Sequence, residues 1–191
     1  MAIGATLYTV TLHLSDIDRG VYQELELRMA RHPSETTEFL VTRLLAYCLE
    51  YTDGITFSDG GVSSTDEPAV LVRDLTGRIT AWIEVGAPDS DRVHRGSKLA
   101  ERVAVYTHRD PVKVLAQLTG KRIHRAEHIP LVSFDRAFVE AAAAALARRN
   151  TATVSVTEGQ LYLELNGTSL GTPIAEQRLG RSRGPDSEPA T

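Results

Sequence analysis

Acidic residues beside two predicted strands are the side chains of this sequence best suited to chemistry. Glu84 lies in the apolar run 82–85, and the pair Asp66-Glu67 precedes a second apolar run that begins at residue 69. Carboxylates are rarely buried in strands unless they are paired or bind a metal. Two strand-borne carboxylates would supply the oxygen ligands that Mg²⁺ or Mn²⁺ prefers. We therefore predict that Glu84 holds a divalent metal ion together with Asp66 or Glu67.

The predicted helix after this strand carries charged residues on one face. Asp91, Arg95, Lys98 and Arg102 recur there at helical spacing. We predict that Arg95 and Lys98 bind phosphate, and that Lys98 can also move a proton, since arginine is a poor proton acceptor near neutral pH. A structural interpretation stays open, in which Glu84 caps this helix or pairs with Arg95.

The charge pattern along the chain agrees with either interpretation. An acidic block at 53–91 precedes a basic block at 92–125, although the whole chain has a net charge of only -4. Adjacent acidic and basic blocks are typical of a site for metal and phosphate. They are equally typical of two solvated surfaces whose charges balance.

The elements that must position these residues follow from side-chain periodicity. Alternation predicts an N-terminal hairpin and a C-terminal hairpin, and helical spacing predicts a first helix with Ser34 as its N-cap. We predict an α/β (α+β) fold in which a mixed β-sheet has flanking helices. The predicted strands are 8–14, 21–29, 55–57, 70–72, 79–85, 103–106, 129–134, 153–156 and 161–165, and the helices begin near residues 34, 89, 111 and 136.

The length and composition of the chain limit its domain number and its expected location in the cell. The chain has 191 residues, of which 42% are hydrophobic, enough for one domain that we place at 1–172. The segment 173–191 is rich in Pro, Gly, Ser and Arg, and we expect it to be disordered. Cys48 is the single cysteine, so no intrachain disulfide can form. With no apolar run of membrane-spanning length and no secretory signal, we expect a cytoplasmic protein without a membrane partner.

Several separated sequence words resemble the YaeQ family in matching order, from about residue 5 to about residue 165. The words are ARHPSET at 30–36, RLLAY at 43–47, DEP at 66–68, WIEVG at 82–86 and VYT at 105–107. The resemblance implies a small bacterial, cytoplasmic protein with a variant of the PD-(D/E)XK fold. That fold has a restriction-endonuclease-like core, and the predicted middle order αβββαβ is the order of this core.

The resemblance also assigns roles to individual positions. Glu84 matches the acid of the (D/E)XK element, which holds divalent metal in working nucleases. Ala69 stands where the preceding motif has its Asp, and Gly86 stands where the motif has its Lys. Lys98, on the following helix, would then replace the motif's lysine as a catalytic residue. Glu35, at the start of the first helix, would be an auxiliary carboxylate or would complement the helix dipole.

Three functions remain open from the sequence. The leading hypothesis is divalent-metal-dependent phosphodiester cleavage of nucleic acid. Ala69 and Gly86 replace the Asp and Lys of the motif, and these replacements favour the alternative, a catalytically degenerate module that binds nucleic acid or protein. A third hypothesis, a zinc peptidase, rests on the H-x-x-E-H pattern of His124, Glu127 and His128.

Overall fold

Alternating side chains fold the start of the chain into a long hairpin. In this computed structural model, which describes residues 4–58 and 66–180, β1 (Thr6–Asp16) pairs antiparallel with β2 (Val21–Arg31). Val10, Leu12 and Leu14 are buried, because every second residue of a strand points to the same face. The predicted N-terminal hairpin is confirmed.

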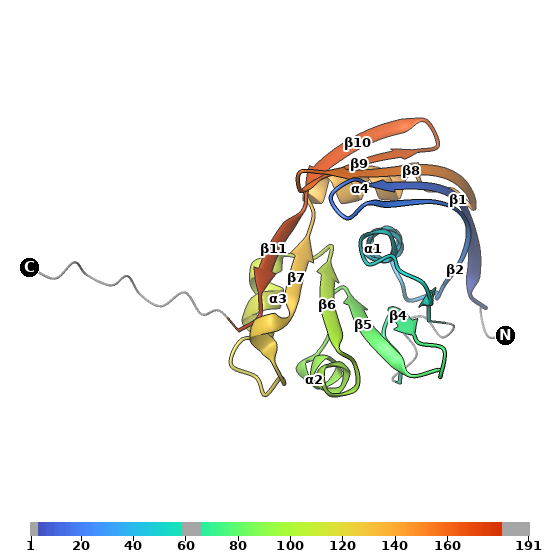
Figure 1. Cartoon of the computed structure of the whole chain (residues 1–191). Coiled ribbons are helices and arrows are strands. Elements are labelled where there is room, and N and C mark those ends of the chain that lie inside the picture. Colours follow the sequence, from blue (N-terminus) through green and yellow to red (C-terminus); the bar gives the residue numbers. More distant parts are fainter. Residues whose placement is uncertain (1–3, 59–65, 181–191) are drawn as a thin grey trace, which may run out of the picture.

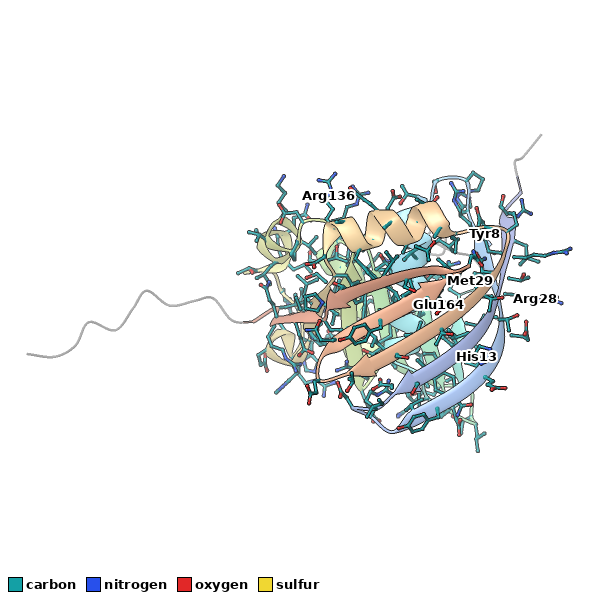
Figure 2. All side chains as sticks on the ribbon, turned by 90° about the horizontal axis from the view of Figure 1, so that it is seen from above. Tyr8, His13, Arg28, Met29, Arg136 and Glu164 are labelled. Atoms are coloured by element: carbon teal, nitrogen blue, oxygen red, sulfur yellow. The ribbon has the colours of Figure 1, made fainter. Side chains whose placement is uncertain are left out.

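The two ends of the chain combine in one five-stranded sheet, here called sheet A. β1 pairs in parallel with β8 (Arg149–Thr157), which continues antiparallel into β9 (Gln160–Leu165) and β10 (Thr168–Pro173). The strand order is β10-β9-β8-β1-β2. The predicted C-terminal hairpin is therefore confirmed as β8-β9, but β10 extends it. Figure 2 looks down on the outer surface of sheet A.

The middle of the chain forms a second mixed sheet, sheet B, with the order β11-β7-β6-β5-β4-β3. β5, β6 and β7 are parallel, whereas β3, β4 and β11 run antiparallel to their neighbours. The strands of sheet B are β3 (Ile55–Phe57), β4 (Val70–Arg73), β5 (Ile79–Val85), β6 (Arg102–Thr107), β7 (Pro130–Ser133) and β11 (Ala175–Arg178). The order α1-β3-β4-β5-α2-β6 agrees with the predicted run αβββαβ.

The helices fill the space between the sheets and cover the far side of sheet B. α1 (Thr37–Leu49) lies between sheets A and B, with α4 (Arg136–Ala145) against α1 and β10 (Figure 1). α2 (Ser90–Leu99) and α3 (Pro111–Leu118) cover the opposite face of sheet B. None of the helices that the structure describes has the length and apolar character needed to cross a lipid bilayer.

The layers enclose two hydrophobic cores. The larger core lies between the sheets and includes most of α1, which is buried on nearly all sides. The smaller core lies beneath α2 and α3 and includes Trp82, Val105, Leu131 and Leu179. Neighbouring residues of β5 therefore pack into different cores: Ile83 packs in the larger core with α1, and Trp82 packs in the smaller core with α2.

Three sequence expectations need correction. The single predicted mixed sheet is two mixed sheets, because the terminal hairpins pair with each other instead of extending the middle strands. The N-cap of α1 is Thr36, whose Oγ1 accepts a hydrogen bond from the amide of Phe39 at 3.1 Å, and not Ser34. Strand β11 lies inside the segment 173–191 that we expected to be disordered. Residues 181–191 of that segment lie outside the described part of the chain.

Candidate functional site

A cavity of about 340 Å³ opens where the parallel strands β5 and β6 end, and we call it the strand-end cavity. Carboxyl ends of parallel strands are the usual place for ligands in α/β proteins, because the following helices begin there. Thr36 at the start of α1 and Asp89 at the start of α2 both line it. His108 and Arg109, which follow β6, also line it.

All four positions that the resemblance assigned to the motif line the strand-end cavity. These positions are Glu35, Ala69, Glu84 and Gly86. β4 pairs with β5 so that Val70 lies opposite Ile83, and one further step of this register brings Ala69 opposite Glu84. Side chains directly opposite each other on antiparallel strands share a face. A carboxylate at position 69, where the resemblance would place an acid, would thus be the cross-strand neighbour of Glu84.

Glu84 is held by two donors. Its Oε1 accepts hydrogen bonds from Trp82 Nε1 at 2.8 Å and from Arg92 Nε at 3.1 Å. Its Oε2 accepts one from Arg92 Nη2 at 3.3 Å. The side chain is buried, and this burial raises the pKa of Glu84, while Arg92 and Trp82 act in the opposite direction. Trp82 and Glu84 are two residues apart on β5, and their hydrogen bond shows that both side chains lie on the same face of the strand.

Arg92 is the site residue that the sequence analysis missed. It pairs with Glu84 where we had considered Arg95, and its Nη2 also donates to the main-chain carbonyl of Glu67 at 2.9 Å. The signal for it was present in the sequence. Asp89 is the N-cap of α2 and its Oδ1 accepts from the amide of Arg92 at 2.9 Å, so Arg92 lies in the first turn of the helix, beside the strand end.

Glu35 reaches the cavity from the segment before α1. Its Oε2 accepts from the amide of His32 at 3.1 Å, and its Oε1 lies 3.5 Å from Nη1 of Arg43, a fully buried arginine of α1. Burial lowers the pKa of Arg43, and Glu35 opposes that change. Because Glu35 precedes the N-cap Thr36, it does not occupy the first turn of the helix, where the acidic residue is Glu38.

The backbone at Gly86, the position that the resemblance matches to a lysine, does not favour a lysine side chain. Its φ is +92°, a conformation that favours glycine, and an added Cβ would lie 3.5 Å from the ring of Phe39 and not beside Glu84. A lysine at this position would be strained and directed towards α1. The local backbone therefore favours glycine at position 86.

The other predicted site residues lie outside the wall of the strand-end cavity. Asp66 is exposed and lies 3.3 Å from Arg95 Nη1, while the carboxylate of Glu67 lies 2.5 Å from Arg73. Lys98 is exposed on α2. The main-chain carbonyl of Glu67 accepts a hydrogen bond from Arg92, the partner of Glu84. The predicted charged face of the helix is also shorter than expected, because Arg102 belongs to β6 and bonds to Glu50.

The histidine pattern does not form the expected helical zinc motif. His124 precedes a three-residue 3-10 helix (Ala126–His128), and the left-handed Arg125 interrupts the backbone between them. The geometry in which two histidines share one α-helical face is therefore absent at 124–128. Glu127 lies 3.5 Å from His128, and both side chains are exposed.

The arrangement around Glu84 does not fit a divalent ion. Both oxygens of its carboxylate already accept hydrogen bonds from protein donors. Within residues 4–58 and 66–180, no group of three or more Asp, Glu, His or Cys side chains is arranged to hold a metal. What the cavity offers instead is a buried ion pair beside Arg109 and His108.

His108 is a further titratable group that lines the strand-end cavity. Burial and the neighbouring Arg109 lower its pKa below the ordinary value of 6.5. Among the described residues, its buried Nδ1 has no hydrogen-bond partner. A second cavity of about 760 Å³, between the starts of α3 and α4, shares Thr36, His108 and Arg109 with the first.

Solved structures share the whole fold. The structure of the YaeQ protein from Pseudomonas syringae has a TM-score of 0.82 and 31% identity, over 94% of this chain and 98% of that one. The YaeQ protein from Xanthomonas axonopodis pv. citri has a TM-score of 0.76 and 27% identity, over 91% and 98%. The likeness covers two mixed sheets and four α-helices within the part of the chain that the structure describes.

Sequence relatives point to the same family. The chain is 39% identical over 108 residues to the protein of Escherichia coli strain K12 named "Uncharacterized protein YaeQ", a match that covers 56% of this chain and 59% of that protein. A protein of the same name from Salmonella typhi is 37% identical over the same length. The aligned part thus spans about three-fifths of the curated relatives. The family model described as "YaeQ protein" matches residues 1–173, and the chain therefore belongs to the YaeQ family.

Proposed function

We propose that the strand-end cavity binds the phosphate backbone of nucleic acid without cleaving it. One observation carries the proposal: Glu35, Ala69, Glu84 and Gly86 line a single cavity, but the carboxylate of Glu84 is paired with a guanidinium. This arrangement keeps the location of a nuclease-like site and removes its free carboxylate. It supports the degenerate binding module over the enzyme.

Arg109 is the cation best placed to meet a phosphate. It is exposed, it lies on the wall of both cavities, and no ion pair to it occurs within the described residues. Phosphate contacts of this kind depend on salt, since each one releases condensed counterions from the nucleic acid.

The test measures retention of short single-stranded and double-stranded DNA and RNA on filters as salt is raised. Arg109→Ala should weaken binding several-fold and reduce the slope of log affinity against log salt by about one. The matched control is Arg28→Ala, which removes the same charge from the outer surface of sheet A (Figure 2). Equal binding by both variants, or no binding by the unaltered protein, would contradict the proposal.

Phosphodiester cleavage with Mg²⁺ or Mn²⁺ is the competing hypothesis, and the pairing of Glu84 with Arg92 argues against it. Cleavage would require the carboxylates of the cavity to be available to the metal. Three carboxylates, Glu35, Glu84 and Asp89, line the same cavity. Under this hypothesis, end-labelled nucleic acid incubated with either metal should be cut by the unaltered protein and not by Glu84→Gln. Intact substrate in both reactions removes this candidate and leaves the binding function untouched.

A further inference from the structure

Arg92 joins oxygens from two neighbouring segments of the chain. Its guanidinium donates to both carboxylate oxygens of Glu84, at 3.1 and 3.3 Å, and to the carbonyl of Glu67 at 2.9 Å. Glu84 is the penultimate residue of β5, and Glu67 lies three residues before β4. Carboxylate and carbonyl oxygens are the groups that a hard divalent cation would take. A side-chain cation thus lies where the two segments bring oxygen atoms together.

The position of this guanidinium is fixed from several sides. Asp89 accepts from the amide of Arg92 at 2.9 Å, which ties the residue to the first turn of α2. Trp82 donates to Glu84 at 2.8 Å and orients the carboxylate. Gly96 lets α2 approach closely, because an added Cβ there would lie 2.5 Å from the indole of Trp82. The close packing of α2 on β5 and the hydrogen bonds of Asp89 and Trp82 therefore fix the position of the Arg92–Glu84 pair.

The charges at this place agree with the residue that is missing. Ala69, opposite Glu84 in the continued register, brings no carboxylate, so the strand pair supplies one negative charge. On this strand pair a single guanidinium balances the one carboxylate, whereas the two charges of a divalent ion would be only half balanced by it. Two carboxylates would have suited a divalent ion. The absence of a carboxylate at Ala69 and the presence of the Arg92 guanidinium therefore agree with each other electrostatically.

We propose that Arg92 is a built-in substitute for a divalent cation, which makes the strand-end cavity independent of metal. It follows that the chain carries a latent metal site. Restoring a carboxylate at position 69 and removing the guanidinium at position 92 would together open it. The inference concerns the same cavity as the proposed function but does not depend on nucleic-acid binding.

The experiment titrates Mn²⁺ alone into four proteins by isothermal calorimetry: the unaltered chain, Ala69→Asp, Arg92→Gln and the double variant. The double variant should bind Mn²⁺ at least tenfold more tightly than either single variant, with an effect beyond the sum of the two changes. Ala69→Asn combined with Arg92→Gln is the matched control. It keeps the size of the side chains without the second charge, and it should bind no Mn²⁺.

Two results would overturn the inference. If Ala69→Asp alone binds Mn²⁺ as tightly as the double variant, the guanidinium does not occupy the place of the cation. If the unaltered chain binds Mn²⁺ and Glu84→Gln does not, the native site is already a metal site. Circular dichroism checks the fold of each variant. Should the double variant not fold, Ala69→Asp with Arg92→Lys keeps the positive charge and should bind at least tenfold more weakly than Ala69→Asp with Arg92→Met.

Filter retention of nucleic acid by the unaltered chain in the presence of EDTA separates the two proposals. Retention without metal agrees with both. Absence of retention, together with the expected gain of Mn²⁺ binding in the double variant, rejects the binding function and leaves the role of Arg92 intact.

Discussion

Glu84 combines an unfavourable environment with a favourable partner. Burial in the interior disfavours its charge, while Arg92 and Trp82 stabilise the charge through hydrogen bonds. A buried ion pair of this kind contributes little net stability against an apolar replacement. Removing one partner is costly, however, because the other charge is left without compensation.

Glu84→Gln should therefore lower the free energy of unfolding by about 1–3 kcal/mol, less than for a fully buried pair because Arg92 is partly exposed. Urea denaturation followed by circular dichroism measures the change. Glu164→Gln, on the exposed outer surface of sheet A (Figure 2), is the control and should change stability by less than about 0.5 kcal/mol. Equal stability of the two variants would show that Arg92 relaxes into solvent without cost.

His108 makes stability depend on pH in a defined direction. Its pKa is lowered in the folded state by burial and by Arg109, below the ordinary value of 6.5. As pH falls through 6.5, the unfolded chain takes up a proton that the folded chain does not yet bind. The contribution of this group to the free energy of unfolding therefore decreases below pH 6.5 and is complete above it.

The variant His108→Gln should lose less stability than the unaltered chain between pH 7 and pH 5. Urea denaturation at pH 7, 6 and 5 gives the comparison. His124→Gln replaces an exposed histidine and should keep the full dependence on pH. Parallel curves for His108→Gln and the unaltered chain would contradict the assignment.

The sequence identified two acids that reach the cavity and missed their partners. Glu84 and Glu35 were predictable because acids beside apolar runs need a reason to be there. For Arg92, the N-cap Asp89 indicated a place in the first turn of α2, but the orientation of its side chain towards Glu84 depends on how closely α2 packs onto β5, which no local pattern records. Gly86 is similar: its identity was visible in the sequence, but its φ of +92° was not.

α2 approaches β5 closely at Gly96. An added Cβ at Gly96 would lie 2.5 Å from the ring of Trp82, so any larger residue would push the helix outward. A displaced α2 would also displace Arg92 from Glu84. The glycine therefore acts on the site through the helix to which it belongs.

Gly96→Ala should destabilise the protein by about 1–3 kcal/mol, the usual cost of overpacking, although alanine is the better helix former by about 1 kcal/mol. Thermal unfolding followed by circular dichroism measures it. Lys98→Ala on the exposed face of α2 is the control and should be nearly neutral. A rise in melting temperature for Gly96→Ala would mean that the helix propensity of alanine outweighs the cost of overpacking against Trp82.

Local patterns predicted which segments are strands better than which strands meet. The alternation around Val10 and Leu12 identified β1 and its buried face, but its parallel partner β8 begins at Arg149, far along the chain. The segment Ala175–Arg178 has no alternation of burial, and it is a strand because it pairs with β7. Such long-range pairing is set by the assembled core and not by the residues of one segment.

The protein has two hydrophobic cores, and residues from different parts of the chain complete them. The smaller core, beneath α2 and α3, includes Leu179, which follows β11 and is almost fully buried. A residue that the sequence placed in a disordered segment thus completes the packing under Trp82 and Leu131. The prediction failed because burial of one leucine outweighs the polar residues around it.

Leu179→Ala should lower the free energy of unfolding by about 2–4 kcal/mol, through lost burial and the cavity left behind. The control is Leu75→Ala, which changes the same side chain in a fully exposed turn and should have no measurable effect. Both are measured by urea denaturation. A Leu179→Ala protein as stable as the control would mean that the smaller core closes without this residue.

The indole that donates to Glu84 belongs to the single tryptophan of the chain. Its ultraviolet emission therefore comes from one place, buried between β5 and α2 and next to the Arg92 pair. The native protein thus carries an optical reporter at its own cavity, with no label required. The wavelength and intensity of that light should respond to whatever alters the carboxylate beside it.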